Sequence, residues 1–361
     1  MRQGLIGRRQ FLAVGGLGVV AALAGCSNSG SGPTGSSASA GSTPNSGQLE
    51  EVGVIEGSPA SYRVPHYVAV AQGFYEDHGL AVSSVSTSGG TTSAQVLAAG
   101  RSQFAIGQLV DAINLQNAGV DVQGIAEISC RINNDVLIRS NGTGSIADIL
   151  QQKSIGVSTL GSGSWQFIRW IALLADIDPD SLKIVAVGSS GPQSLESGQI
   201  DVLVFSGPQG LNLVQTGEAK YLVQSMDPTS GLTPGLPALG QALNTPQLFN
   251  WVYCTTDFLK SRPDTARNFA GALQDALDWI NGHTAAELAD LIVEAKTFEG
   301  IDASILEQSF QLMLAHGAVP KTTVINQTDY ENSALFLKQA DAKTYTTTPS
   351  FDELANNSFN S

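Results

Sequence analysis

The amino-acid sequence predicts an α/β fold with largely parallel sheets, arranged in two lobes. Short apolar segments rich in β-branched residues alternate with helical patterns along most of the chain, which is typical of right-handed strand–helix–strand units. The chain has 361 residues, of which 42% are hydrophobic, so it can bury more core than one ordinary domain holds. We therefore expect two globular lobes.

The first 25 residues have the pattern of an export signal. Arg8 and Arg9 stand before an apolar run from Phe11 to Ala24, which is shorter than the roughly 20 residues that a membrane-spanning helix needs. This pattern predicts a twin-arginine signal peptide over residues 1–25. The run ends in Leu-Ala-Gly-Cys, which resembles the bacterial lipobox, and the resemblance implies that Cys26 carries a lipid and begins the mature protein.

Residues 26–48 are almost free of large apolar side chains and consist mainly of Ser, Gly, Thr and Pro. Such a segment cannot bury enough surface to offset the entropy of folding. We therefore expect a disordered tether between the lipid anchor and the globular body. Together with the signal peptide, it predicts an extracytoplasmic protein that is lipid-anchored to the cell membrane after twin-arginine export.

The charge balance is acidic, with 18 Lys and Arg against 32 Asp and Glu and a formal net charge of -14. A chain of this charge repels phosphate backbones, so we expect no nucleic-acid partner. Only 14% of the residues are charged, and this low fraction, with the many small polar residues, fits an exported protein.

The stretch from Ser86 to Gln108 combines a glycine turn, a helix and a buried strand. Gly89 and Gly90 permit close backbone approach, and the hydroxyls of residues 91–93 can cap a helix that Gly100 ends. Such a helix start presents free N–H groups and a positive dipole end to an anion. An ordinary strand–turn–helix–strand connection without a ligand explains the same pattern, so both interpretations stay open.

The alternation of strands and helices continues to residue 255. The segment from Asp227 to Thr245 is rich in Pro, Gly, Ser and Thr, which predicts a long surface connection. We expect strands at 52–55, 81–85, 104–107, 122–129, 135–139, 154–159, 183–187, 200–205 and 249–255, and helices at 65–79, 91–99, 109–117, 145–150, 163–175 and 193–197.

Beyond Asp257 the pattern becomes helical. After Pro263, apolar residues recur at helical spacing as far as Ile280, and we assign this stripe to core packing rather than to a cofactor site. Further helices are expected at 285–295, 303–315 and 330–339.

The remaining cysteines, Cys130 and Cys254, can form a disulfide in an oxidising compartment or remain two buried thiols, and the sequence leaves both open. The chain has no Gly-x-Ser-x-Gly nucleophile elbow, and its histidines show no metal-ligand spacing. We therefore expect no catalytic residue, no metal and no cofactor. The four histidines are His66, His78, His283 and His316.

Three segments and one short step carry a family resemblance. The first segment is PHYVAVAQGFYEDHGLAV at 65–82, the second has a Ser-Gly-Gly turn and spans 88–107, and the third, 145–164, has an IGVS strand and a Gly-Ser-Gly-Ser turn. A Gly-x-Ile-Asp step follows at 198–201. Together they resemble the extracytoplasmic solute-binding proteins of the nitrate, sulfonate and taurine class, which includes binding proteins for thiamine pyrimidine precursors. One departure is Gly207, where the family commonly has an acidic residue before proline.

The resemblance implies the type II periplasmic-binding-protein fold, with the ligand held in a cleft between two lobes. Residues 49–138 and 252–361 would form lobe 1, and residues 139–251 lobe 2. It also implies a monomer that delivers a small-molecule ligand to the membrane subunits of an ABC importer, without catalysis.

We expect ligand contacts in the loops beyond the carboxyl ends of the strands. The helix starts at Gly89-Gly90 and at 161–164, one in each lobe, would face the same ligand. The candidate ligand-binding residues are Glu56, Ser58, Tyr62, Ser88, Gly89, Gly90, Thr91, Thr92, Gln108, Arg131, Ser158, Gly161, Ser162, Gly163, Ser164, Trp165 and Ser206.

Three candidates have a second explanation. Arg131 is the cation that we expect near the cleft, and a surface or interlobe salt bridge accounts for it equally well. Trp165 can stack on a ring or cover an alkyl group, or it can pack inside the lobe. Glu56 can receive an amine or a pyrimidine, or it can be a solvated loop carboxylate.

The leading hypothesis is a binding protein for a small anion such as a sulfonate, nitrate or taurine, with a thiamine-precursor pyrimidine as the alternative ligand. An exported enzyme is a second hypothesis, because a family relative makes a pyrimidine with a cysteine-rich motif and a histidine. His66 lies in the matching helix, but this chain has no cysteine cluster, which counts against the enzyme. A sensory lipoprotein that reports to a membrane receptor is the third.

Overall fold

The computed structural model describes residues 49–231 and 233–360, all of which belong to one compact unit. The predicted signal peptide at 1–25, the lipidation site Cys26 and the tether at 26–48 lie outside these residues. Within the described ranges, no helix combines the length and the apolar character that crossing a membrane requires.

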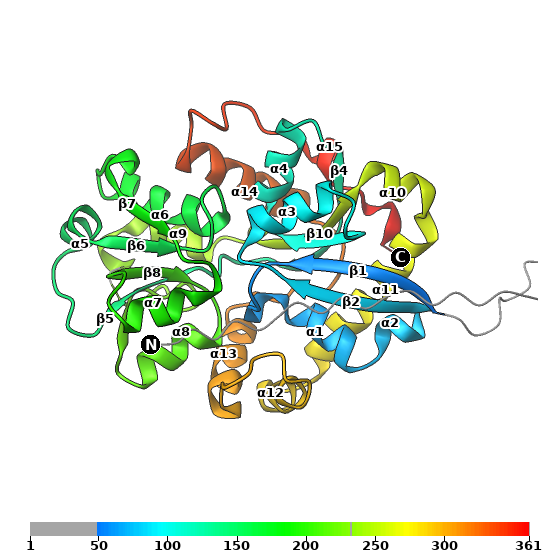
Figure 1. The fold of residues 1–361 in the computed structure, drawn as a ribbon, viewed down its shortest axis with the longest axis horizontal. Helices are drawn as coiled ribbons and strands as arrows, with labels where there is room; N and C mark the ends of the chain where they lie inside the picture. The colour runs from blue at the N-terminus through cyan, green and yellow to red at the C-terminus, as the bar shows by residue number, and fades with distance from the viewer. Residues whose placement is uncertain (1–48, 232, 361) are drawn as a thin grey trace, which may run out of the picture. The chain divides into compact units, whose positions relative to one another are not determined.

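The strands form two separate five-stranded sheets (Figure 1). The first has the order β2-β1-β3-β10-β4. Strand β1 is parallel to β2 and β3, whereas β10 is antiparallel to β3 and β4. Helices pack on both faces of this sheet, so neighbouring residues of its inner strands, such as Val54 and Ile55 of β1, are buried in two different apolar clusters. The strands are β1 (Glu50–Glu56), β2 (Leu80–Ser86), β3 (Phe104–Gly107), β4 (Val122–Ser129) and β10 (Asn250–Thr255).

The second sheet repeats this arrangement with the order β7-β6-β8-β5-β9. Strand β6 is parallel to β7 and β8, and β5 is antiparallel to β8 and β9. The predicted α/β fold is confirmed, but the sheets are mixed rather than largely parallel, because each has two parallel and two antiparallel pairs of neighbouring strands. The strands are β5 (Asp135–Arg139), β6 (Ser154–Val157), β7 (Lys183–Ala186), β8 (Val202–Phe205) and β9 (Ala219–Val223).

We refer to each sheet and the helices packed on it as the first and the second lobe. The chain passes between the sheets over residues 130–134 and 224–249. The predicted lobe boundaries at 138 and 251 fall inside β5 and β10, each of which pairs within one sheet only. An apolar strand has the same sequence pattern in either sheet, so the pattern alone does not assign it to a lobe.

The first lobe contains the expected helices, with one break. Gly73 adopts φ 76, a left-handed conformation that divides the helix predicted over 65–79 into two. Gly100, with φ 69, ends the next helix as predicted. These helices are α1 (Val64–Ala71), α2 (Phe74–Asp77), α3 (Gly90–Ala98) and α4 (Leu109–Asn117).

The second lobe contains elements that the sequence analysis missed. The segment 227–245, predicted to be a surface connection, includes helix α9, whose Leu239 and Leu243 are buried in the second core. Helix α8 and strand β9 were also not predicted. The helices are α5 (Ile146–Gln152), α6 (Gly163–Leu174), α7 (Gly191–Glu196), α8 (Pro208–Gln215) and α9 (Pro237–Asn244).

The C-terminal region is helical, as predicted. The apolar stripe of α11, from Ala266 to Ile280, is buried in the first core, so its assignment to packing is confirmed. Helix α14 packs against both α4 and α6 and therefore contacts both lobes (Figure 1). The helices are α10 (Thr256–Ser261), α11 (Pro263–Gly282), α12 (Ala285–Glu294), α13 (Ala303–Ala315), α14 (Gln327–Ala340) and α15 (Phe351–Leu354).

Cys130 and Cys254 are both free thiols, so the possible disulfide is not formed. Cys254 in β10 pairs with Gln123 near the start of β4, whereas Cys130 follows the last residue of β4. Seven residues along a strand span roughly 23 Å, far more than the ~6 Å between the Cα atoms of a disulfide.

Candidate ligand-binding site

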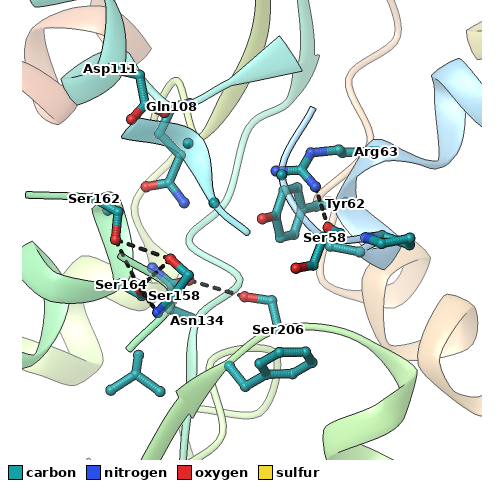
Figure 2. A pocket seen from close by; sticks show the side chains of 18 residues that line it. Ser58, Tyr62, Arg63, Gln108, Asp111, Asn134, Ser158, Ser162, Ser164 and Ser206 are labelled. Atoms are coloured by element: carbon teal, nitrogen blue, oxygen red, sulfur yellow. Dashed lines mark hydrogen bonds between the residues drawn. The ribbon is translucent and has the colours of Figure 1, made fainter. Parts of the chain in front are cut away.

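A cavity of about 60 Å³ lies where the carboxyl ends of strands from both sheets meet (Figure 2). This is the expected place for a ligand in an open α/β sheet. Its walls come from both lobes and from the first crossing segment. The lining residues are Gly57, Ser58, Pro59, Ala60, Tyr62, Arg63, Gly89, Gly90, Gln108, Asp111, Asn134, Ser158, Ser162, Gly163, Ser164, Val204, Phe205 and Ser206.

The structure brings ten of the seventeen candidate residues together around this cavity. They come from five separate loops, which meet because the parallel strands of each sheet end at a common edge. The ten are Ser58, Tyr62, Gly89, Gly90, Gln108, Ser158, Ser162, Gly163, Ser164 and Ser206.

Three serines form a cluster at the N-terminus of α6. The Ser158 hydroxyl lies 3.1 Å from that of Ser162 and 2.9 Å from that of Ser164, and the latter two are 3.0 Å apart (Figure 2). The backbone N–H of Ser158 donates to the Ser164 hydroxyl at 3.1 Å. Hydroxyls can donate or accept, so this cluster and the positive end of the α6 dipole can bind an electron-rich oxygen.

Arg63 is the cation at the cavity, and the sequence analysis missed it. Its side chain is only 5% exposed, its Nη1 donates to the carbonyl of Ser58, and its guanidinium lies 5.0 Å from the centroid of the Tyr62 ring. The Nε atom has no hydrogen-bond partner within the described part of the chain. Arg63 directly follows Tyr62, which is the last candidate residue that the sequence analysis named in this loop.

Arg131, the predicted cation, does not line the cavity. Its Nη1 donates to the carbonyl of Asn244, which fits the non-ligand explanation, although the partner is a carbonyl rather than a carboxylate. The prediction of Arg131 as a cleft residue is therefore wrong, because the first crossing segment turns Asn134 rather than Arg131 toward the cavity. The Asn134 side-chain carbonyl accepts from the Ser206 hydroxyl at 3.0 Å.

Glu56 lies behind Arg63 rather than in the cavity wall. Its carboxylate is 3.7 Å from Arg63 Nε and accepts from the hydroxyls of Tyr67 at 3.0 Å and Ser86 at 3.3 Å. Burial raises the pKa of Glu56, and the charge of Arg63 and these hydrogen bonds oppose that shift. Glu56 is therefore neither a solvated loop carboxylate nor a direct lining group, and it holds the guanidinium in place.

Asp111 is a second carboxylate that the sequence analysis missed. Its Oδ2 accepts from the Gln108 N–H at 2.9 Å, and its Oδ1 has no hydrogen-bond partner among the described residues. Burial raises its pKa to about 6. A Cβ at Gly90 would lie 2.3 Å from Asp111 Oδ2, so the first turn of α3 already faces a carboxylate. The anion expected at Gly89-Gly90 therefore has to share that helix end with Asp111.

The two lobes touch across the cavity. A Cβ at Gly163 would lie 1.5 Å from Gln108 Oε1, so only glycine lets the Gln108 side chain reach the start of α6. The Thr91 hydroxyl donates to the carbonyl of Leu160 at 3.3 Å. The structure therefore describes a closed cleft.

The remaining candidates surround the cavity without lining it. Ser88 and Thr92 share a hydrogen bond between hydroxyls at 3.1 Å. Trp165 packs on the second core and lies under the Arg169 guanidinium, 4.3 Å from its ring centroid, which fits the packing explanation. The candidates outside the lining set are Glu56, Ser88, Thr91, Thr92, Arg131, Gly161 and Trp165.

A second, apolar cavity of about 30 Å³ adjoins the first and shares Gln108 and Asn134 with it. Its other walls are mainly side chains such as Ile132, Phe167 and Phe249. Movement of the two shared amides would join a polar cavity to an apolar one.

His66 lies in the first core and not at a cavity. Its side chain is fully buried, and its ring nitrogens are each 2.8 Å from a hydroxyl, of Tyr75 and of Ser84. Burial lowers its pKa to about 3, so it stays neutral. The described residues also contain no group of three or more His, Cys, Asp or Glu side chains that could hold a metal ion.

Comparison with known proteins agrees with this geometry. Residues 60–286 match the model of the family described as NMT1/THI5 like. YtlA of Bacillus subtilis, named as a binding protein, is 21% identical over 289 residues, which cover 78% of this chain and 81% of YtlA. The 4-amino-5-hydroxymethyl-2-methylpyrimidine phosphate synthase THI13 of Saccharomyces cerevisiae is 20% identical over 232 residues, 63% of this chain and 66% of that protein.

Two solved structures have the same fold. The alkanesulfonate-binding protein SsuA of Xanthomonas axonopodis pv. citri has a TM-score of 0.63 at 14% identity, covering 81% of this chain and 94% of SsuA. The periplasmic nitrate-binding protein NrtA of Synechocystis PCC 6803 has a TM-score of 0.64 at 12% identity, covering 87% and 88%. The chain belongs to the NMT1/THI5-like family and has the two-lobed fold of the periplasmic solute-binding proteins.

Proposed function

We propose that this protein is the membrane-anchored, substrate-binding component of an ABC importer and that it captures a small anion between its two lobes. One observation carries the proposal: the Arg63 guanidinium from the first lobe and the Ser158, Ser162 and Ser164 cluster from the second line one buried cavity. A guanidinium and hydroxyl donors match the oxygens of a sulfonate, nitrate or carboxylate.

The electrostatics support an anion of low charge. Glu56 partly balances Arg63 from behind, and Asp111 also lines the cavity. An anion that enters such a cavity gains charge-assisted hydrogen bonds from Arg63 but is repelled by any ionised carboxylate. A singly charged ligand therefore fits better than a doubly charged one.

Ligand capture by closure follows from the division of the site. Each lobe supplies part of the lining, so a ligand interacts fully only with the closed state and shifts the population toward it. The importer's membrane subunits would then recognise the closed form. This function needs no catalysis, and the burial of His66 away from the cavity supports binding over chemistry.

A thiamine-precursor pyrimidine remains the second candidate ligand. It is favoured by the unpartnered Oδ1 of Asp111, which can accept from a ring amino group, and by the Tyr62 and Phe205 rings in the cavity wall. A sensory role would use the same site and differ in the partner, which a pull-down of the closed protein against importer and receptor subunits distinguishes.

A thermal-shift screen of the mature protein tests the assignment. Sulfonates, nitrate, taurine and aminopyrimidines form the panel, and a ligand at 100 times its Kd stabilises the folded state by about 2.7 kcal/mol. A shift with the anions alone supports the first proposal, and a shift with pyrimidines alone replaces it with the second. The absence of any shift in either class contradicts both ligands.

A further inference from the structure

A chain of hydrogen bonds outside the cavity joins the two lobes through the C-terminal segment. The Tyr345 hydroxyl accepts from Gln166 Nε2 at 3.3 Å and donates to Asn114 Oδ1 at 3.0 Å. Asn114 Nδ2 in turn donates to the carbonyl of Gly161 at 3.4 Å. Asn114 lies on α4 in the first lobe, whereas Gln166 lies on α6 and Gly161 on the turn before it, both in the second lobe.

Two members of this network are shielded from water: Tyr345 is 2% exposed and Gln166 is 1% exposed. Asn114 and Gly161 are half-buried. A buried polar group that loses its partner costs more free energy than an exposed one, because water does not replace the bond at once. Burial raises the pKa of Tyr345 to about 12, so its hydroxyl remains a neutral donor at physiological pH.

Tyr345 belongs to the first lobe by its packing. It lies in the same apolar cluster as Ile113 and Leu115 of α4. Opening of the cleft therefore separates it from Gln166, and separates Asn114 from Gly161, while the bond between Tyr345 and Asn114 can persist.

The network ends at the ligand cavity without lining it. Gly161 immediately precedes Ser162, Gly163 and Ser164, which line the cavity. The bond from Asn114 therefore holds the serine turn in its closed position, and Tyr345 fixes the orientation of the Asn114 amide that makes this bond.

We propose that Tyr345 is a positioning residue that stabilises the closed cleft through Asn114 and Gln166 and so sets the rate of ligand release. This proposal rests on the proposed function only in its consequence for ligand release, since closure itself can be measured without a ligand.

The test measures closure directly. Thr91→Cys and Leu160→Cys, in a Cys130→Ser background, place thiols at two positions in different lobes that lie in contact in this closed structure, where the Thr91 hydroxyl donates to the Leu160 carbonyl. A short bifunctional thiol reagent then reports the closed population by its cross-linking rate in the ligand-free mature protein. Tyr345→Phe removes only the hydroxyl, and we expect a cross-linking rate about two- to tenfold lower, the effect of one net hydrogen bond.

Tyr330→Phe is the matched control. Tyr330 is also 2% exposed, and its hydroxyl donates to the carbonyl of Pro349 at 2.8 Å without bridging to α6. We expect an unchanged cross-linking rate in this variant and similar melting temperatures for the two. The proposal is overturned if Tyr345→Phe cross-links as fast as the parent double-cysteine protein, or if both variants show the same decrease.

A double-mutant cycle separates the network from general destabilisation. Asn114→Ala should also lower cross-linking, and Tyr345→Phe should have a smaller effect in that variant than alone, because only its bond to Gln166 then remains to be lost. Additive effects contradict the proposal. If Tyr345→Phe lowers cross-linking as expected but the thermal-shift screen finds no ligand, this inference stands while the proposed function fails.

Discussion

Arg63 Nε lies 3.7 Å from Glu56 Oε2, and both side chains are almost fully buried beside the cavity. A buried cation without compensation is costly, so Glu56 is what permits a guanidinium at this position. The same pairing limits the positive charge that Arg63 presents to a ligand. The pair therefore determines both the stability of the site and the charge of the ligand that fits it.

Arg63→Gln should weaken anion binding by about 10- to 150-fold, the loss of a charge-assisted hydrogen bond worth about 1.5–3 kcal/mol. Glu56 can then take up a proton, since burial already raises its pKa, so the fold should persist. Arg169→Gln is the control, because Arg169 pairs with Asp180 at 2.9 Å and does not line the cavity. Calorimetric titration with the best anion measures the difference, and equal affinities would remove Arg63 from the site.

Gly163→Ala should hinder closure, because its Cβ would lie 1.5 Å from Gln108 Oε1. We expect a loss of about 1–3 kcal/mol in ligand binding, as for other overpacked contacts. Gly282→Ala, where a Cβ meets no atom within 4 Å, is the control. The double variant Gly163→Ala/Gln108→Ala should bind more tightly than Gly163→Ala alone, and failure to do so would show that Gln108 is not the obstacle.

The stability of the protein should depend on pH through Asp111. Burial raises the folded-state pKa from 3.8 to about 6, so the folded state binds the proton more tightly than the unfolded state. The proton on Asp111 therefore stabilises the folded state fully below about pH 4, and this stabilisation is lost as the pH rises to about 6. The free energy of unfolding falls by about 3 kcal/mol at most. Asp111→Asn should abolish this part of the slope in urea unfolding between pH 4 and 7. Identical slopes in both proteins contradict the assignment.

Thiol titration should find Cys130 and Cys254 free. Burial raises the pKa of Cys130 to about 12, so its reaction in the native protein at neutral pH should be slow. Cys254 is fully buried in β10 and should react only after unfolding. Under denaturing, non-reducing conditions both should react at once, and recovery of neither thiol would indicate a disulfide.

Cys26→Ser should release the protein from membranes if Cys26 carries the lipid. Labelling of cells with a fatty-acid analogue measures the loss of the lipid, and fractionation of their membranes measures the release of the protein. Cys130→Ser is the matched control and should remain in the membrane fraction. Continued labelling of the Cys26→Ser protein would contradict the lipid anchor.

Local patterns predicted most of the secondary structure. The helices at 109–117 and 303–315 and the strands at 122–129 and 135–139 have the predicted bounds, because periodicity and helix-ending residues are properties of a short segment. The pattern failed for α9, where Pro, Gly and Thr flank a helix that Leu239 and Leu243 anchor in the core. Its two buried leucines outweigh the loop-like composition around them.

The sequence by itself determined the fold class, the two lobes and the glycine- and serine-rich turns at the cavity, because each depends on residues near one another in the chain. Only the tertiary structure decided that Arg63 and not Arg131 faces the cavity, and that Asp111 lies against Gly90. It alone also joined Tyr345 to Asn114 and Gln166. The physical reason is that the burial and charge of a side chain depend on neighbours from distant segments, which no local pattern describes.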